Sequence, residues 1–142
     1  MGVYRGIAQD NVTINSGTAT LQTLTVTGVL TASGGVTGKV RLPVAAVAAA
    51  GNNQGTAAAL SEGLNVVSAA DGTKGVILPT AVAGAVVIVK NTVDAALKIY
   101  PASGAAINAV AANGSYDITN LTSTMLVASS ATQWYSVPLV AS

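Results

Sequence analysis

The 142-residue chain contains no cysteine, no histidine and no phenylalanine, and only 8% of its residues are charged. Without Cys or His it has no thiolate nucleophile, no disulfide, no imidazole base and no ordinary set of zinc ligands. Six Lys and Arg residues against five Asp and Glu residues give a net charge of +1, so we expect no basic surface that binds nucleic acid. These absences predict a protein that is not an enzyme and that uses neither a metal nor a cofactor.

The residues that are present are largely small and apolar: 51% are hydrophobic, and the mean hydropathy is +0.59. The most continuous apolar stretch lies between Lys74 and Lys90, contains Pro79 and Gly84, and is too short to cross about 30 Å of hydrocarbon, so no membrane partner is expected. Ala and Val dominate, and Ala buries little area, so the core of one copy would be shallow. We therefore expect an oligomer that buries apolar surface between its subunits.

The N-terminal residues 1–40 carry few charges and alternate apolar with polar side chains at Val12–Asn15 and Leu24–Thr27, which predicts half-buried strands. Isolated strands are marginally stable in water, so this arm needs a partner surface. It is either a flexible arm or a segment that becomes ordered on a sister subunit or another protein, and the regular alternation favours order. Residues 41–60 read as a connector, because a short Ala-rich helical stretch ends at Gly51–Gly55.

Residues 61–142 contain short strand-like runs about every 8–12 residues with turn residues between them, a pattern typical of all-β domains. Asp71-Gly72 and Asn113-Gly114 predict hairpin turns. The continuous β-branched run Ala85–Lys90 predicts a central strand buried on both faces. The predicted fold is therefore all-β: an antiparallel β-sandwich or jelly-roll-like C-terminal domain, preceded by an extended β-rich N-terminal arm.

Several segments of this domain resemble a domain common in small virion proteins of tailed bacteriophages, among them head decoration and head-fibre proteins. The segments that carry this resemblance are Gly75–Pro79, Val86–Asn91, Ile99–Gly104, Ile107-Asn108 and Ala128–Tyr135. In addition, Leu24–Gly35 is similar to the repeats of phage fibre and spike shafts. The resemblance implies a virion-surface protein, often a homotrimer, whose partners are its own copies and the major capsid protein. It brings no catalytic residues with it.

On this interpretation the chain is a capsid decoration protein, and its N-terminal half contacts the shell or a neighbouring subunit. The predicted contact residues are Arg5, Val12, Ile14, Leu24, Val26, Lys39 and Arg41. The three cations could steer docking onto an acidic capsid surface, or could simply keep the chain soluble. The sequence is consistent with either role for these charges.

An alternative function is a tail-fibre, spike or baseplate component whose sandwich binds a host glycan. Trp134 and Tyr135 would then be an exposed aromatic pair that stacks on a sugar. The competing interpretation, which we prefer, places one ring in the core and lets the other cover an edge, because Trp is highly buried on average.

Two further patterns carry no chemistry. The segment Ser33–Val40 departs from a phosphate-binding loop at both its first and its last position, so no cofactor site is predicted. The carboxylates of Glu62, Asp71, Asp94 and Asp117 are scattered without the spacing of a calcium loop, so no metal site is predicted either.

Overall fold

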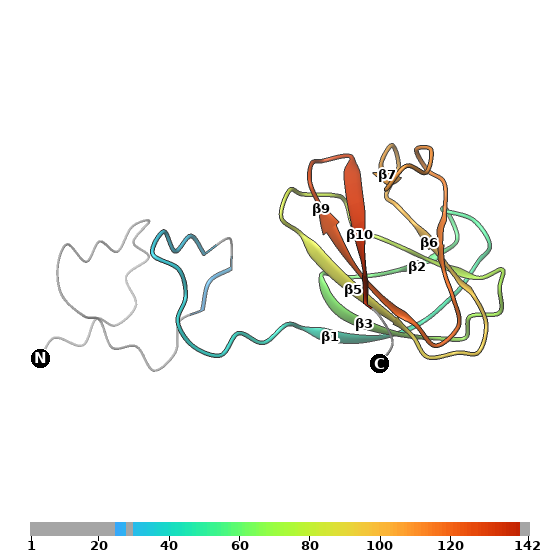
Figure 1. Cartoon of the computed structure of the whole chain (residues 1–142), viewed down its shortest axis with the longest axis horizontal. Helices are drawn as coiled ribbons and strands as arrows, with labels where there is room; N and C mark the ends of the chain where they lie inside the picture. Colours follow the sequence, from blue (N-terminus) through green and yellow to red (C-terminus); the bar gives the residue numbers. More distant parts are fainter. Residues whose placement is uncertain (1–24, 28–29, 140–142) are drawn as a thin grey trace, which may run out of the picture. The chain divides into compact units, whose positions relative to one another are not determined.

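The computed structural model describes residues 25–27 and 30–139, and ten strands lie in this part of the chain (Figure 1). The chain divides into two units, residues 1–39 and 40–142, and all of these strands belong to the second unit. The strands are β1 (Val44–Ala48), β2 (Ala58–Ala59), β3 (Gly63–Ser68), β4 (Gly75–Ile77), β5 (Val86–Asn91), β6 (Leu97–Tyr100), β7 (Ala106–Ile107), β8 (Tyr116–Ile118), β9 (Ser123–Ala128) and β10 (Gln133–Leu139). The described residues contain no helix, so the all-β prediction is confirmed for them.

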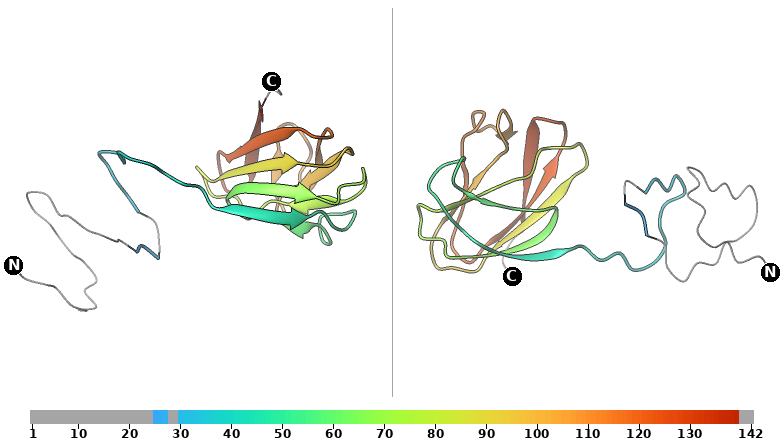
Figure 2. Two further views of the ribbon diagram at one scale, coloured as in Figure 1. Left: turned by 90° about the horizontal axis from the view of Figure 1, so that it is seen from below. Right: turned by 180° about the vertical axis from the view of Figure 1, so that it is seen from behind.

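The strands form two sheets, one with the order β1-β3-β5-β9-β10-β7 and one with the order β2-β4-β6-β8. The first six strands alternate between the two sheets, and within each sheet they pair in parallel. The chain therefore winds as a β-solenoid, and each coil places one strand in each sheet. Figure 2 (left) shows β1, β3, β5 and β9 side by side as successive rungs. The antiparallel sandwich or jelly roll that the sequence suggested is thus the wrong strand arrangement.

The two ends of the parallel ladder differ. On the far side of β5, strand β9 pairs in antiparallel orientation and is followed by β10, also antiparallel, so the winding stops there. At the other end β1 is an edge. The Pro43 carbonyl accepts from Leu64 N–H, and Ala49 N–H donates to the Ser68 carbonyl, so the odd-numbered residues of β1 bond to β3. In a parallel ladder the alternate residues, Val44, Ala46 and Ala48, then point their N–H and C=O groups away from β3, in the plane of the sheet. Among the described residues no strand pairs with these groups.

The core lies between the two sheets and is built from the inward-facing half of each strand. Its fully buried side chains from the six-stranded sheet are Val67, Val87, Val89, Ile107, Leu126 and Trp134. Those from the four-stranded sheet are Val76, Leu97 and Ile99. Buried β-branched and Leu side chains on a pleated surface supply most of the stabilising apolar burial, about 1.5–3 kcal/mol for each fully buried side chain.

Two buried asparagines fix corners of the winding. The Asn65 amide donates to the Ser61 carbonyl at 2.8 Å and accepts from Ser61 N–H at 3.2 Å. The Asn91 amide donates to the Ala95 carbonyl at 2.7 Å and accepts from Val93 N–H at 3.1 Å. Because both side chains bond backbone groups that the corners leave without ladder partners, burying these amides costs little.

Several local predictions change in the light of the strand order. The interval 41–60, expected to be a connector, holds β1 and β2, and its Ala-rich stretch is extended rather than helical because it pairs with β3. Asp71-Gly72 and Asn113-Gly114 do form turns, but each turn joins strands of different sheets, so neither makes a hairpin. The predicted strand at Ala85–Lys90 is central, yet only alternate side chains of β5 are fully buried within the chain.

Candidate functional site

The most distinctive surface of the described chain is the outward face of the six-stranded sheet. Strands β3, β5 and β9 each alternate fully buried with half-buried residues, and the half-buried residues point outward. The register aligns one outward residue from each of five neighbouring strands. This cross-strand row consists of Val44, Leu64, Ile88, Met125 and Val137.

Flanking positions extend the row in both directions along the strands. On one side Val86 pairs with Val127, which pairs with Tyr135; on the other side lies Val66 of β3. We call these four residues and the five of the row the outer face. Val44, Tyr135 and Val137 at its margins are 69%, 53% and 43% exposed, and the six side chains between them are half-buried.

Charge is nearly absent from the outer face. Lys90 is the single charged strand residue that points to this side, and its ammonium group donates to the Leu121 carbonyl in the loop before β9. Glu62 stands just before β3, where the register continues the row of Val86. The centre of the face therefore presents methyl groups and one thioether to its surroundings.

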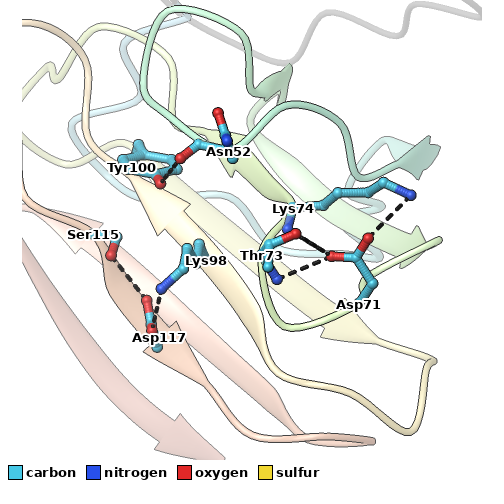
Figure 3. Close-up of polar contacts among 8 residues, drawn as sticks. All are labelled: Asn52, Asp71, Thr73, Lys74, Lys98, Tyr100, Ser115 and Asp117. Carbon is cyan, nitrogen blue, oxygen red and sulfur yellow. Dashed lines mark hydrogen bonds and ion pairs between the residues drawn. The ribbon is translucent and has the colours of Figure 1, made fainter.

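The four-stranded sheet has a different outward surface. There Lys98 of β6 lies directly across from Asp117 of β8, and Lys98 Nζ is 2.8 Å from Asp117 Oδ2 (Figure 3). The hydrogen bond that Lys98 donates to the Asp117 carboxylate is the main reason why the pKa of Lys98 lies above its ordinary value. The Ser115 hydroxyl donates to the other carboxylate oxygen at 2.9 Å. An outward ion pair of this kind is typical of a sheet face that meets water.

The predicted contact residues fall mainly in the N-terminal half. Arg5, Val12, Ile14 and Leu24 lie outside the described residues. The others are described and exposed: Val26 is 42% exposed, and both Lys39 and Arg41 present their charges to solvent.

The two aromatic residues of β10 point to opposite sides of the sheet. Trp134 is fully buried, with Ala128 of β9 and Ile107 of β7 as its cross-strand neighbours. Tyr135 belongs to the outer face. The exposed Trp134–Tyr135 pair of the glycan-binding alternative is therefore not formed, because adjacent residues of a strand cannot share one face.

Asp71 and Asp117 stabilise a turn and a cross-strand ion pair, respectively. Asp71 Oδ1 accepts from Lys74 N–H at 2.9 Å, from the Thr73 hydroxyl at 2.8 Å and from Thr73 N–H at 2.9 Å (Figure 3). These bonds, with that from Lys74 N–H the largest, hold the pKa of Asp71 well below its usual range. Among the described residues no group of three or more Asp or Glu side chains could hold a metal ion.

A surface hollow of about 410 Å³ lies beside this turn, lined by Gly51, Asn52, Thr56, Thr73 and Lys74. Its backbone is held by the Tyr100 hydroxyl, which donates to the Asn52 carbonyl at 2.9 Å (Figure 3). The one charged group of the lining, Lys74, already forms an ion pair of 3.3 Å with Asp71. The hollow therefore offers no unpaired charge to a ligand.

Apart from Tyr135, the residues of the outer face were not among those that the sequence singled out. Its signal was present in the runs that are apolar at both even and odd positions, since such strands have two apolar faces. The run at β5 was interpreted as a strand buried within the chain on both sides. The structure buries one side in the core and leaves the other on the surface.

No helix in residues 25–27 and 30–139 is long and apolar enough to span a membrane. Comparison with protein families, with curated proteins and with solved structures gave no match.

Proposed function

We propose that this chain is a non-enzymatic decoration protein of a phage capsid, which binds the head shell as a homotrimer and stabilises it. The observation that carries the proposal is the outer face: nine apolar side chains on one sheet surface, beside which Lys90 is the one charged strand residue on the same side. A contiguous apolar surface of this kind marks a site where a protein surface is covered by another protein. The resemblance of several segments to phage virion proteins supplies the class of assembly.

The mechanism of such a protein is adhesion. Each bound copy adds buried area across neighbouring shell subunits, and binding to the assembled shell but not to free subunits stabilises the shell by mass action. The chemistry of the chain is consistent with this role, because the sequence has no Cys or His and the hydroxyl and carboxylate groups near the turn at Asp71 are engaged with one another. A scaffold of this kind needs shape and apolar surface rather than a reactive group.

The proposal is tested on heads of a phage that lacks this chain. Purified protein is mixed with expanded heads, and the bound amount is measured by co-sedimentation, followed by the temperature at which the heads release DNA. We expect saturable binding of hundreds of copies per head and a higher release temperature. Absence of binding, or a handful of copies located on the tail of the intact virion, would overturn the proposal in favour of a fibre, spike or baseplate component.

The exposed cations allow a sharper version of this test. The double variant Lys39→Ser/Arg41→Ser should bind heads more weakly than the wild type and with a smaller dependence on salt, if these charges face an acidic shell. The double variant Lys74→Ser/Lys98→Ser is the matched control, because it also removes two positive charges, which lie on the solenoid and pair with Asp71 and Asp117. Equal losses in both variants would show that total charge, and not the position of Lys39 and Arg41, governs docking.

A further inference from the structure

The outer face raises the question of what covers it. We infer that it is a subunit interface of this protein, and that its occupant is the same face of a second copy of the chain, related to the first by a twofold axis. This inference goes beyond the proposed function, because a face packed on its own copy closes as a dimer and the proposed homotrimer would need a different contact. It also separates that surface from the exposed cations proposed to dock on the shell.

The two sheets of the same solenoid provide an internal comparison. On the four-stranded sheet the outward side carries the Lys98–Asp117 ion pair. On the six-stranded sheet the positions that correspond to it, in the middle of the strands, hold Leu64, Ile88 and Met125. A sheet that meets water on one side alternates apolar with polar residues, whereas strands that are apolar on both sides are typical of sheets covered on both faces. The composition of the outer face therefore indicates a permanent cover.

The chemistry of the face selects a second copy as that cover. Apart from the single ammonium group of Lys90, which donates to the Leu121 carbonyl, the face presents no charge pattern that a partner of opposite charge could recognise. A neutral, pleated, Val-rich surface is complementary to another such surface, because two twisted sheets can pack face to face with interdigitated side chains at a separation of about 10 Å. Every copy of the chain carries this surface, so a complementary partner is present at the concentration of the protein itself.

The size of the face is sufficient for a specific contact. Five strands spaced about 4.8 Å apart give a width of about 24 Å, and three rows of outward residues give a height of about 20 Å. Two such footprints bury about 1,000 Å² in total, which reaches the lower limit for a specific protein interface. Val44 at one margin and Tyr135 and Val137 at the other lie inside this footprint and have the largest exposed fractions of the face.

The test measures mass in solution, without any shell. Native mass spectrometry and sedimentation at about 50 µM should give the wild type as a dimer of 13.8 kDa chains. Ile88→Thr, at the centre of the face, should shift the mass to one chain, with an increase of at least tenfold in the dissociation constant. Thr keeps the strand preference of a β-branched residue, so the far-UV circular dichroism should be unchanged. Val82→Thr is the matched control: Val82 is 62% exposed, lies in the loop before β5, and should keep the wild-type mass.

If Ile88→Thr fails to fold, the isosteric double variant Val86→Thr/Val127→Thr probes the same face and should also give single chains. A wild type of one chain at this concentration, or an oligomer that the folded face variants leave intact, would overturn the inference. A trimer that these variants disperse would overturn the twofold packing of the outer face inferred here. Because head binding is measured in a separate experiment, failure of the interface prediction does not decide whether the protein binds capsids, and the reverse also holds.

Discussion

The burial of Trp134 gives a sharp test of the solenoid core. Trp134 is the single Trp of the chain, is fully buried, and lies between Ala128 and Ile107 in the six-stranded sheet. Truncation to Ala removes about 150 Å² of buried aromatic surface, which at about 25 cal/mol per Å² corresponds to about 4 kcal/mol. This agrees with the range of about 3–5 kcal/mol for buried Trp→Ala changes, and is a large part of a typical domain stability of about 5–15 kcal/mol.

The assay is urea unfolding at a fixed protein concentration, followed by far-UV circular dichroism because the variant has lost its only indole. Trp134→Phe should lose less than half as much free energy of unfolding as Trp134→Ala, since a ring remains and the buried indole N–H has no hydrogen-bond partner among the described residues. Val82→Ala is the surface control and should stay within about 0.5 kcal/mol of the wild type. A loss below about 1.5 kcal/mol for Trp134→Ala would refute the burial on which the core depends.

Two further predictions concern turns. Gly63 has a φ of 99°, and a Cβ there would lie 2.5 Å from the Pro43 carbonyl oxygen, whereas Gly72 has a φ of 86° and open space around it. In thermal unfolding Gly72→Ala should lower the free energy of unfolding by about 1–2 kcal/mol, from backbone strain alone, and Gly63→Ala should lower it clearly more. Equal losses in the two variants would contradict the close approach of the first two coils. The second prediction concerns the pH dependence of stability at the turn that Asp71 holds. Because the pKa of Asp71 is lowered in the folded chain, the unfolded chain takes up a proton first, and the stabilisation from this carboxylate is lost as the pH falls below about 4. Asp71→Asn should therefore show a smaller fall in melting temperature between about pH 4 and pH 2 than the wild type; parallel curves for the two proteins would refute this role.

The positions of most strands after residue 60 could be predicted from the sequence, whereas β1, β2 and the partners of the strands could not. The β-branched run at β5 and the alternation at Leu97–Tyr100 are local signals, and strands form at both places. Pairing in a solenoid joins each strand to the next but one, and no local pattern encodes that step. A turn such as Asp71-Gly72 looks the same whether the chain returns to the strand it has just left or goes on to another sheet.

The structural repeat of the solenoid coil could not be recognised in the sequence either. Val44 pairs with Leu64 and Leu64 with Ile88, so each coil takes about 20 residues, as solenoid repeats do. The loops of the coils differ in length and share no sequence motif, so the repetition exists in the hydrogen-bond ladder and not in the residue order. At β1 the helix preference of Ala, a few tenths of a kcal/mol per residue, is overridden by pairing with β3.

The outer face depends on the same distinction. The apolar character of both sides of β5 could be read from the sequence, but which side meets the core follows from the register with β3 and β9. A shift of one residue would exchange the two sides. Trp134 illustrates this, because its burial and the exposure of Tyr135 are two consequences of one register.

The unequal ends of the parallel ladder have a consequence for how such a chain can change in evolution. The antiparallel return of β9 and β10 closes one end, so an added coil at that end would have to displace strands that are already paired. At the other end, β1 directs the backbone groups of Val44, Ala46 and Ala48 outward, and an inserted segment of about one coil before Pro43 would find a ready template. The length of the solenoid is thus free to vary by whole coils at its first rung, while the core around Trp134 and the closing strands stay unchanged.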